Sequence, residues 1–225
     1  AAGERSFPLR TKMPKMPAEL FAAGDPELLL AEARQDERDI EFCQIKDAVL
    51  TGADLTGLNF HSVLLENCRF LNCRAERSAF VDVIFRRCDL SNANFSQSYF
   101  NRCEFHSCKA LGTNFYHSGL KQMTVQESNC QYANFDESKL EYIEIQGSDF
   151  SGAILGNCRL TEFTVQQTRL EGAVFVKTSL KDVDLSDDQI EGITVSDNCW
   201  ELRGVTVSPW QAIDLARLFG LTVKN

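Results

Sequence analysis

Apolar residues recur at every fifth position across most of the chain. In the stretch 91–105, SNANFSQSYFNRCEF, three phenylalanines lie five residues apart, and a small residue stands two places before each. Carried in both directions, every position divisible by five from Ile40 to Val195 is apolar or small, which makes thirty-two positions without a slip. Such self-similarity predicts an array of pentapeptide repeats rather than one or two ordinary domains.

A period of five matches neither an α-helix, with its period of 3.6, nor a flat strand, which alternates every two residues. The chain must therefore turn after each pentapeptide. A column of residues spaced by twenty shows a recurring corner, because seven of its eight members are Gly or Asn, which accept the positive φ of a type II turn. This column consists of Gly52, Asn72, Asn92, Gly112, Tyr132, Gly152, Gly172 and Gly192. Four pentapeptides therefore make one coil.

The sides of the predicted coil are not equivalent. On two sides the position two before each apolar centre is held by small, hydroxyl or thiol side chains, as in the series from Ser78 to Thr178. A third side carries bulky residues there, among them Val63 and Phe163, and is expected to turn differently. Between residues 108 and 132, Ala110 and Cys130 replace larger centres, so we expect a kink or a locally thin rod there.

Units such as ADLTG (53–57), ANFSQ (93–97) and ANFDE (133–137) resemble the pentapeptide-repeat proteins, whose pattern centres on Leu or Phe with a small residue two before it. The resemblance covers about seventy per cent of the chain. It implies an all-β solenoid, a right-handed quadrilateral β-helix of about eight coils over residues 40–195, with short helices at both ends. A fold of this kind does not by itself imply an activity.

The N-terminal end lies outside the repeat. Residues 1–17 carry four basic groups against one acidic group and match nothing downstream, so we expect an expression leader with the native start at Met13 or Met16. Residues 18–39 are expected to form a helical cap, because Asp25 and Pro26 are typical of a helix start. Such a cap would cover the open end of the array.

Residues 196–225 no longer follow the five-residue repeat, and they are expected to contain a second helix. Ser208 can cap it, Pro209 suits its first turn and Gly220 can stop it. Its apolar surface is explained either by a plug on the end of the rod or by a dimer interface between two rods. The segment resembles the C-terminal helix of the Qnr and MfpA group, in which it forms a two-fold dimer, and this resemblance implies the dimer role for Trp210, Leu215, Leu218 and Phe219.

The same resemblance implies a function. In the Qnr and MfpA group the long dimer mimics duplex DNA, binds DNA gyrase or topoisomerase IV and relieves quinolone inhibition. Many Qnr proteins interrupt the rod with two loops, whereas nothing shifts the phase here, so the chain is similar to the loopless members. The alternative is a rigid protein-interaction scaffold with an unrelated partner.

Charge is distributed unevenly along the repeat. The whole chain has a net charge of −9, residues 40–110 carry eight acidic and eight basic groups, and residues 111–195 carry thirteen acidic and six basic groups. Dimerisation through the C-termini would join the acidic halves into a band that attracts a basic DNA-binding surface and repels nucleic acid. The other explanation is a solvated acidic exterior. The residues expected to form a partner-binding surface are Asp136, Glu137, Glu141, Glu144, Asp149, Glu162, Asp182, Asp184, Asp187 and Asp188.

Catalytic, cofactor and metal sites are not expected. The three histidines, His61, His106 and His117, fall at outward positions without a nucleophile at a suitable spacing, and a packed square rod offers no cleft. Seven of the nine cysteines occupy the small position of the repeat, which indicates a packing role in a reducing compartment. With neither a membrane span nor a signal peptide in the sequence, we expect a cytoplasmic protein.

Overall fold

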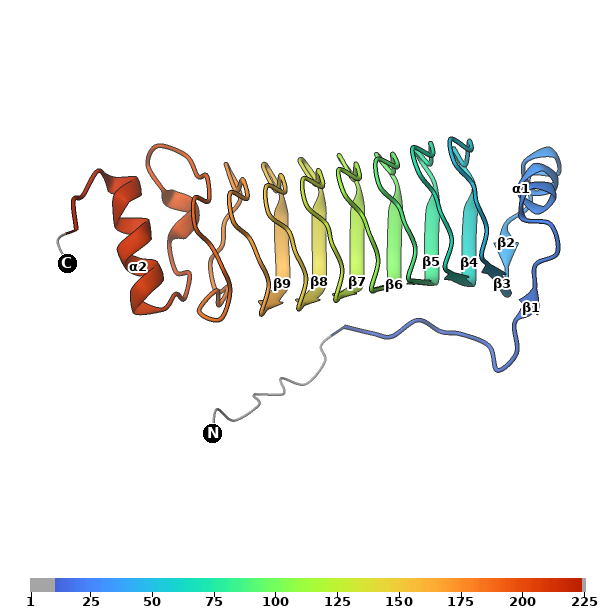
Figure 1. The fold of residues 1–225 in the computed structure, drawn as a ribbon, viewed down its shortest axis with the longest axis horizontal. Coiled ribbons are helices and arrows are strands. Elements are labelled where there is room, and N and C mark those ends of the chain that lie inside the picture. The colour runs from blue at the N-terminus through green and yellow to red at the C-terminus, as the bar shows by residue number, and fades with distance from the viewer. Residues whose placement is uncertain (1–10, 224–225) are drawn as a thin grey trace.

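The computed structural model describes residues 11–223, and its main feature is a rod of stacked parallel strands (Figure 1). Each eight-residue strand pairs with the next one twenty residues later, so that Phe80 lies opposite Phe100. The six long strands are β4 (Asn59–Glu66), β5 (Ala79–Arg86), β6 (Tyr99–His106), β7 (Gly119–Gln126), β8 (Lys139–Gln146) and β9 (Arg159–Gln166). The solenoid makes about seven turns, against about eight expected, and the predicted β-solenoid with a short helix at each end is confirmed.

The interior is filled by the residues counted in fives. Of the thirty-two positions from Ile40 to Val195, all but Leu160 and Val195 are buried. Phenylalanine rings of successive coils lie parallel to one another: the centroids of Phe95 and Phe115 are 5.5 Å apart, with an interplanar angle of 12°. Because each layer supports the next, the apolar side chains form one continuous core along the array.

All four corners of the coil have a residue in the left-handed region. Gly52 has a φ of 70°, as the Gly and Asn column predicts, but Arg77, Asp82 and Arg87 occupy the other three corners with φ between 53° and 59°. The corner that contains Asp82 lies in the middle of the long strands, which explains why the side with bulky residues turns differently. We call it the mid-strand corner; its members in β4–β9 are Ser62, Asp82, Arg102, Gln122, Tyr142 and Glu162.

Hydroxyl side chains at the small position complete the backbone hydrogen bonding of a corner. The Ser98 hydroxyl donates to the carbonyl of Ala75 at 2.8 Å and accepts from the amide of Ser78 at 3.1 Å. Ser118 repeats this arrangement one coil later. These positions therefore select Ser or Thr because buried backbone groups need partners that the turn itself does not supply.

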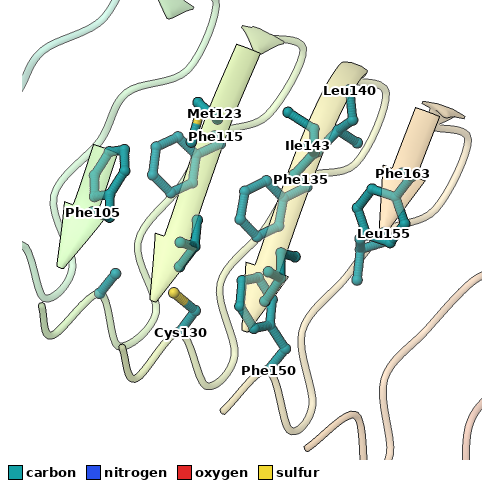
Figure 2. Close-up of a pocket in the computed structure, with 13 residues that line it drawn as sticks. Phe105, Phe115, Met123, Cys130, Phe135, Leu140, Ile143, Phe150, Leu155 and Phe163 are labelled. Carbon is teal, nitrogen blue, oxygen red and sulfur yellow. The ribbon is translucent and has the colours of Figure 1, made fainter. Parts of the chain in front are cut away.

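The core volume missing at Ala110 and Cys130 appears as a small cavity rather than as a break in the rod. The cavity has a volume of about 20 Å³ and is lined by apolar side chains, among them Phe115 and Phe135 (Figure 2). Strand β7 pairs with β6 and β8 in uninterrupted register. The coils therefore stay stacked by their backbones while side-chain contacts are lost inside.

The N-terminal end of the rod is covered by helix α1 (Pro26–Gln35). The Asp25 carboxylate accepts the amides of Glu27 and Leu28, which confirms the predicted helix start, and Leu30 and Ala33 are buried against the core. Three short strands complete this end, namely β1 (Phe21–Ala22), β2 (Ile40–Glu41) and β3 (Cys43–Lys46).

Residues 11–17 lie along the rod, although the sequence links them to a leader. Their backbone runs past the mid-strand corner, and hydrogen bonds join it to side chains of β4, β5, β7 and β8 (Figure 1). We call residues 11–15 the strap. The other part of the expected leader, residues 1–10, lies outside the described residues, and the origin of the segment stays a prediction.

The β-structure continues past Val195, where the count of fives ends. The Leu180 amide donates to the carbonyl of Glu201 at 2.9 Å, and the Leu185 amide donates to the carbonyl of Thr206 at 2.8 Å. Donor and acceptor are therefore twenty-one residues apart, whereas the same bond in the regular array, such as that from the Leu170 amide to the Gln189 carbonyl, spans nineteen. A 3₁₀ turn, η1 (Trp200–Leu202), begins this last part-coil, so the boundary expected at residue 195 falls before the final layer.

Candidate interaction surfaces

Helix α2 (Pro209–Ala216) is anchored on the C-terminal layer of the rod. Ser208 and Gln211 form a reciprocal capping box, and the Gln211 side-chain amide donates to the carbonyls of Leu185 and Asp188, both at 2.7 Å. A 3₁₀ turn, η2 (Arg217–Phe219), follows, and Gly220 ends it with a φ of 71°. The predicted cap, first-turn proline and terminal glycine are all confirmed.

The four residues expected at a dimer interface divide into two groups. Leu215 is partly buried and packs against the core. Trp210, Leu218 and Phe219 face away from it, with exposed fractions of 79%, 40% and 61%. Leu221 and Val223 add further exposed apolar surface at the same end of the chain. The helix therefore covers the rod with one side and presents an uncovered apolar surface with the other.

The acidic residues of the C-terminal half lie on several sides of the rod, with one concentration. Glu141 and Glu144 flank the mid-strand corner on β8, and Glu162 occupies that corner on β9. Asp182 and Asp184 continue this series in the next coil, where both are exposed. Asp136, Glu137, Asp149 and Asp187 lie on other sides or corners, and Asp149 is held by Arg169 at 3.0 Å.

Asp188 does not belong to the acidic surface. It continues the inward column that runs through Cys68, Ser128 and Thr168, and only 7% of it is exposed. Its Oδ1 accepts the Thr168 amide at 2.8 Å, whereas its Oδ2 is buried without a hydrogen-bond partner. Burial raises the pKa of Asp188 to about 6, and the nearby Asp187 and Asp184 act in the same direction.

Glu201, which lies outside the repeat phase, is fully buried and closes the C-terminal end of the hydrogen-bond ladder. Its Oε1 accepts the Lys177 amide at 2.8 Å and the amide and hydroxyl of Ser196. Burial opposes ionisation, but the hydrogen bonds from Ser196 and Lys177 outweigh it and lower the pKa of Glu201. The carboxylate thus supplies acceptors that a further coil would otherwise provide.

Histidines and cysteines have structural surroundings. Each histidine has a ring nitrogen 2.8–3.4 Å from a carboxylate oxygen. The pairs are His61 with Asp39, His106 with Glu104 and His117 with Glu137. All nine cysteines are buried and unpaired, as the packing role predicts. Within residues 11–223 we find no group of three His, Cys, Asp or Glu side chains that could hold a metal ion. Over the same range, none of the helices has the length and apolar character needed to cross a membrane.

Comparison with known families places the chain among repeat proteins. The model of the pentapeptide repeat region matches residues 78–155, and the model of eight-copy pentapeptide repeats matches residues 41–80 and 153–187. Together these matches run from residue 41 to residue 187 without a gap. The chain belongs to the pentapeptide-repeat family. No curated protein sequence matches it.

Two solved structures show the same architecture. A trypsin-treated variant of QnrB1, a plasmid-mediated fluoroquinolone resistance protein, is 21% identical, with a TM-score of 0.51, over 80% of this chain and 90% of that one. HetL, a cyanobacterial pentapeptide-repeat protein from Nostoc involved in heterocyst differentiation regulation, is 16% identical, with a TM-score of 0.52, over 82% and 93%. At these identities the likeness shows the fold alone, and the chain is a β-helical scaffold of this kind.

Proposed function

We propose that this chain is a DNA mimic that binds DNA gyrase or topoisomerase IV and protects or modulates that enzyme in the presence of quinolone-type inhibitors. The observation that carries the proposal is the exposed apolar surface of Trp210, Leu218 and Phe219 at the end of the acidic half. Two chains joined there would form one long rod with its negative charge at the centre. The proposed protein acts by binding and not by catalysis, and its place would be the cytoplasm, where topoisomerases work on DNA.

Shape and charge support this assignment. A rigid solenoid presents carboxylates at fixed spacings, because each outward column repeats once per coil, roughly every 4.8 Å. Glu141, Asp182 and Asp184 occupy such columns in the C-terminal half. A basic saddle that binds duplex DNA is attracted to an ordered acidic surface through the same long-range electrostatics. The acidic surface itself repels nucleic acid, so no direct DNA binding is expected.

The decisive experiment measures gyrase supercoiling with purified protein, with and without a fluoroquinolone. We expect inhibition of supercoiling or rescue from the drug at micromolar protein. The Asp182→Asn/Asp184→Asn double variant should weaken the effect, whereas Glu41→Gln/Asp47→Asn, which removes two exposed charges from the first coil, should not. If wild-type protein has neither effect on gyrase or topoisomerase IV, the proposal is wrong.

The second candidate function is a rigid interaction scaffold with an unrelated partner. It is favoured by the similarity in fold to HetL, whose described role is in heterocyst differentiation regulation rather than drug resistance. An affinity capture that enriches one other protein and lacks topoisomerase subunits would support this alternative.

A further inference from the structure

The strap occupies a row of polar side chains on the rod. The Lys15 amide donates to Asp82 Oδ1 at 2.7 Å, and the Ser62 hydroxyl donates to the carbonyl of Lys15 at 2.9 Å. Farther along the row, the Lys12 amide donates to Gln122 Oε1 at 2.5 Å. On the rod's side all of these groups belong to side chains of the mid-strand corner. We call Ser62, Asp82, Gln122 and Glu144 the track, since Glu144 accepts the Thr11 amide at 3.1 Å.

The spacing of the track fits an extended backbone. Asp82 and Gln122 are two coils apart, which corresponds to roughly 9.6 Å along the rod. Lys12 and Lys15 are three residues apart, and three residues of extended chain span roughly 10 Å. Two coils of the rod and three residues of extended peptide therefore span nearly the same length. The Lys12 and Lys15 amides can both reach the track without bending the peptide.

The track binds the strap through main-chain groups. Every one of these hydrogen bonds uses an amide or a carbonyl of the strap and none uses one of its side chains. Peptides with other sequences can therefore make the same bonds, provided that they have no proline at the positions of Thr11, Lys12 and Lys15. Recognition of extended segments through main-chain hydrogen bonds is a recurring way in which proteins bind peptides.

Glu104 shows that the strap is an imperfect occupant. This carboxylate lies on β6, between the coils of Asp82 and Gln122, and only 6% of it is exposed. Its Oε2 lies 2.8 Å from His106 Nε2, but its Oε1 is buried without a hydrogen-bond partner. The strap crosses this coil between Lys15 and Lys12. Of its two residues there, Met13 is exposed, and Pro14, which is half-buried, has no amide hydrogen to donate.

Burial along one column indicates that the strap itself covers this site. Glu104, Thr124, Glu144 and Thr164 occupy equivalent outward positions on successive strands. Leu64 and Ile84, earlier in the same column, are half-buried. Glu104 and Thr124 are buried, Glu144 is half-buried at the strap's last described contact, and Thr164 is exposed. The buried carboxylate of Glu104 is therefore accessible to whichever peptide takes the strap's place.

We propose that the track is a binding site for an extended, basic peptide segment of a partner protein, and that residues 11–15 occupy it as an exchangeable internal ligand. An Arg or Lys side chain at the position of Pro14 would supply the donor that Glu104 lacks. Asp82 is already ion-paired with Arg102, at 2.5 Å from its Nε. The acidic groups that match such a ligand are therefore Glu104 and Glu144. This inference does not depend on topoisomerase binding.

The experiment titrates the full chain with two labelled peptides, TKMPKMP, which has the strap's own sequence, and TKMRKMP, in which Arg replaces the first proline. We expect the arginine peptide to bind about tenfold more tightly, because a hydrogen bond to a buried carboxylate is stronger than a neutral one. Its binding should also speed hydrogen exchange at the Lys12 and Lys15 amides, because it displaces the strap.

Two variants, each with a matched control, separate the track from other acidic surfaces. Glu104→Gln should abolish the preference for the arginine peptide, whereas Glu137→Gln, on a different corner, should keep it. Lys12→Pro weakens the strap without altering the track and should raise the affinity for both peptides about fivefold, with Met13→Pro as the matched control. The proposal is overturned if neither peptide binds, if both bind equally in wild type and Glu104→Gln, or if binding leaves the strap amides protected.

Discussion

The Glu201 carboxylate accepts the amide of Lys177 at 2.8 Å, across a separation of twenty-four residues in the chain. The same oxygen accepts two donors of Ser196. Because the regular repeat ends at this point, these partly buried donors have no regular coil to bond to. One side chain from outside the repeat therefore completes the hydrogen bonding of the last layer.

Removing this carboxylate should destabilise the C-terminal end. Glu201→Ala removes a fully buried side chain and leaves its partly buried donors without an acceptor, and we expect it to lower the free energy of unfolding by about 2–4 kcal/mol. Glu201→Gln keeps one acceptor oxygen and should cost less. The measurement is urea unfolding followed by circular dichroism, with the exposed Glu191→Ala as control. Equal stability of Glu201→Ala and Glu191→Ala would contradict the capping role.

Filling the cavity beside Ala110 should stabilise the rod. Ala110→Val adds two methyl groups next to an apolar cavity of about 20 Å³, and we expect a gain of about 1 kcal/mol. Ala75→Val is the matched control, because Ala75 is a fully buried alanine at another interior position and does not line this cavity. Thermal unfolding should show a higher midpoint for the first variant only; a lower midpoint for Ala110→Val would show that the surrounding side chains cannot accommodate the added volume.

The cysteines should be unreactive while the chain is folded. Burial raises the pKa of Cys43 to about 11 and that of Cys103 and Cys130 to about 12, so the reactive thiolate is suppressed. We expect no alkylation by iodoacetamide at pH 9 in the native state and modification of all nine thiols in denaturant. Mass spectrometry gives the number of alkylated cysteines in each state. Rapid native labelling of any one cysteine would show that its coil opens locally.

Asp188 should make the protein less stable as the pH rises from about 4 to about 6. Its folded pKa of about 6 lies above its ordinary value of 3.8, so between these values the folded state binds a proton that the unfolded state has lost. The contribution of Asp188 to stability is therefore fully present below this window and is lost as the pH rises through about 6. Asp188→Asn should remove this dependence and stabilise the chain at pH 7 by about 1 kcal/mol.

The control for this prediction is Asp187→Asn, because Asp187 is exposed beside the buried carboxyl. Chemical unfolding of both variants at pH 4 and pH 7 compares the two positions. If Asp188→Asn were no more stable than wild type at pH 7, the buried charge would not be the cause of the pH dependence.

The repeat could be predicted from the sequence because it depends on local, periodic choices. Phe95 and Phe115 hold the same position in successive coils, and their stacking follows from the count of twenty. Asp188 could also have been assigned to the interior, since it shares a column with Thr168; its charge led to the wrong assignment to the surface. What could not be predicted depends on contacts without a period, such as the Glu201 cap, or on backbone donors, such as the Lys15 amide of the strap.

The final prediction separates the two sides of helix α2. Trp210 and Phe219 are exposed, whereas Leu215 packs on the rod. If two rods join end to end, the Trp210→Ala/Phe219→Ala double variant removes apolar area from the interface and should give a monomer with an unchanged midpoint of unfolding for the array. Leu215→Ala should instead loosen the helix and lower stability.

Light scattering measures the mass of the intact chain in solution. A chain that ends at Val207 lacks helix α2 altogether and serves as the comparison. We expect a dimer for the intact chain and a monomer for both the double variant and the shortened chain. A monomeric mass for the intact chain would leave the helix as a plug for the rod. A dimer that persists in the shortened chain would place the contact elsewhere, because the exposed side chains of α2 and η2 would then be absent from it.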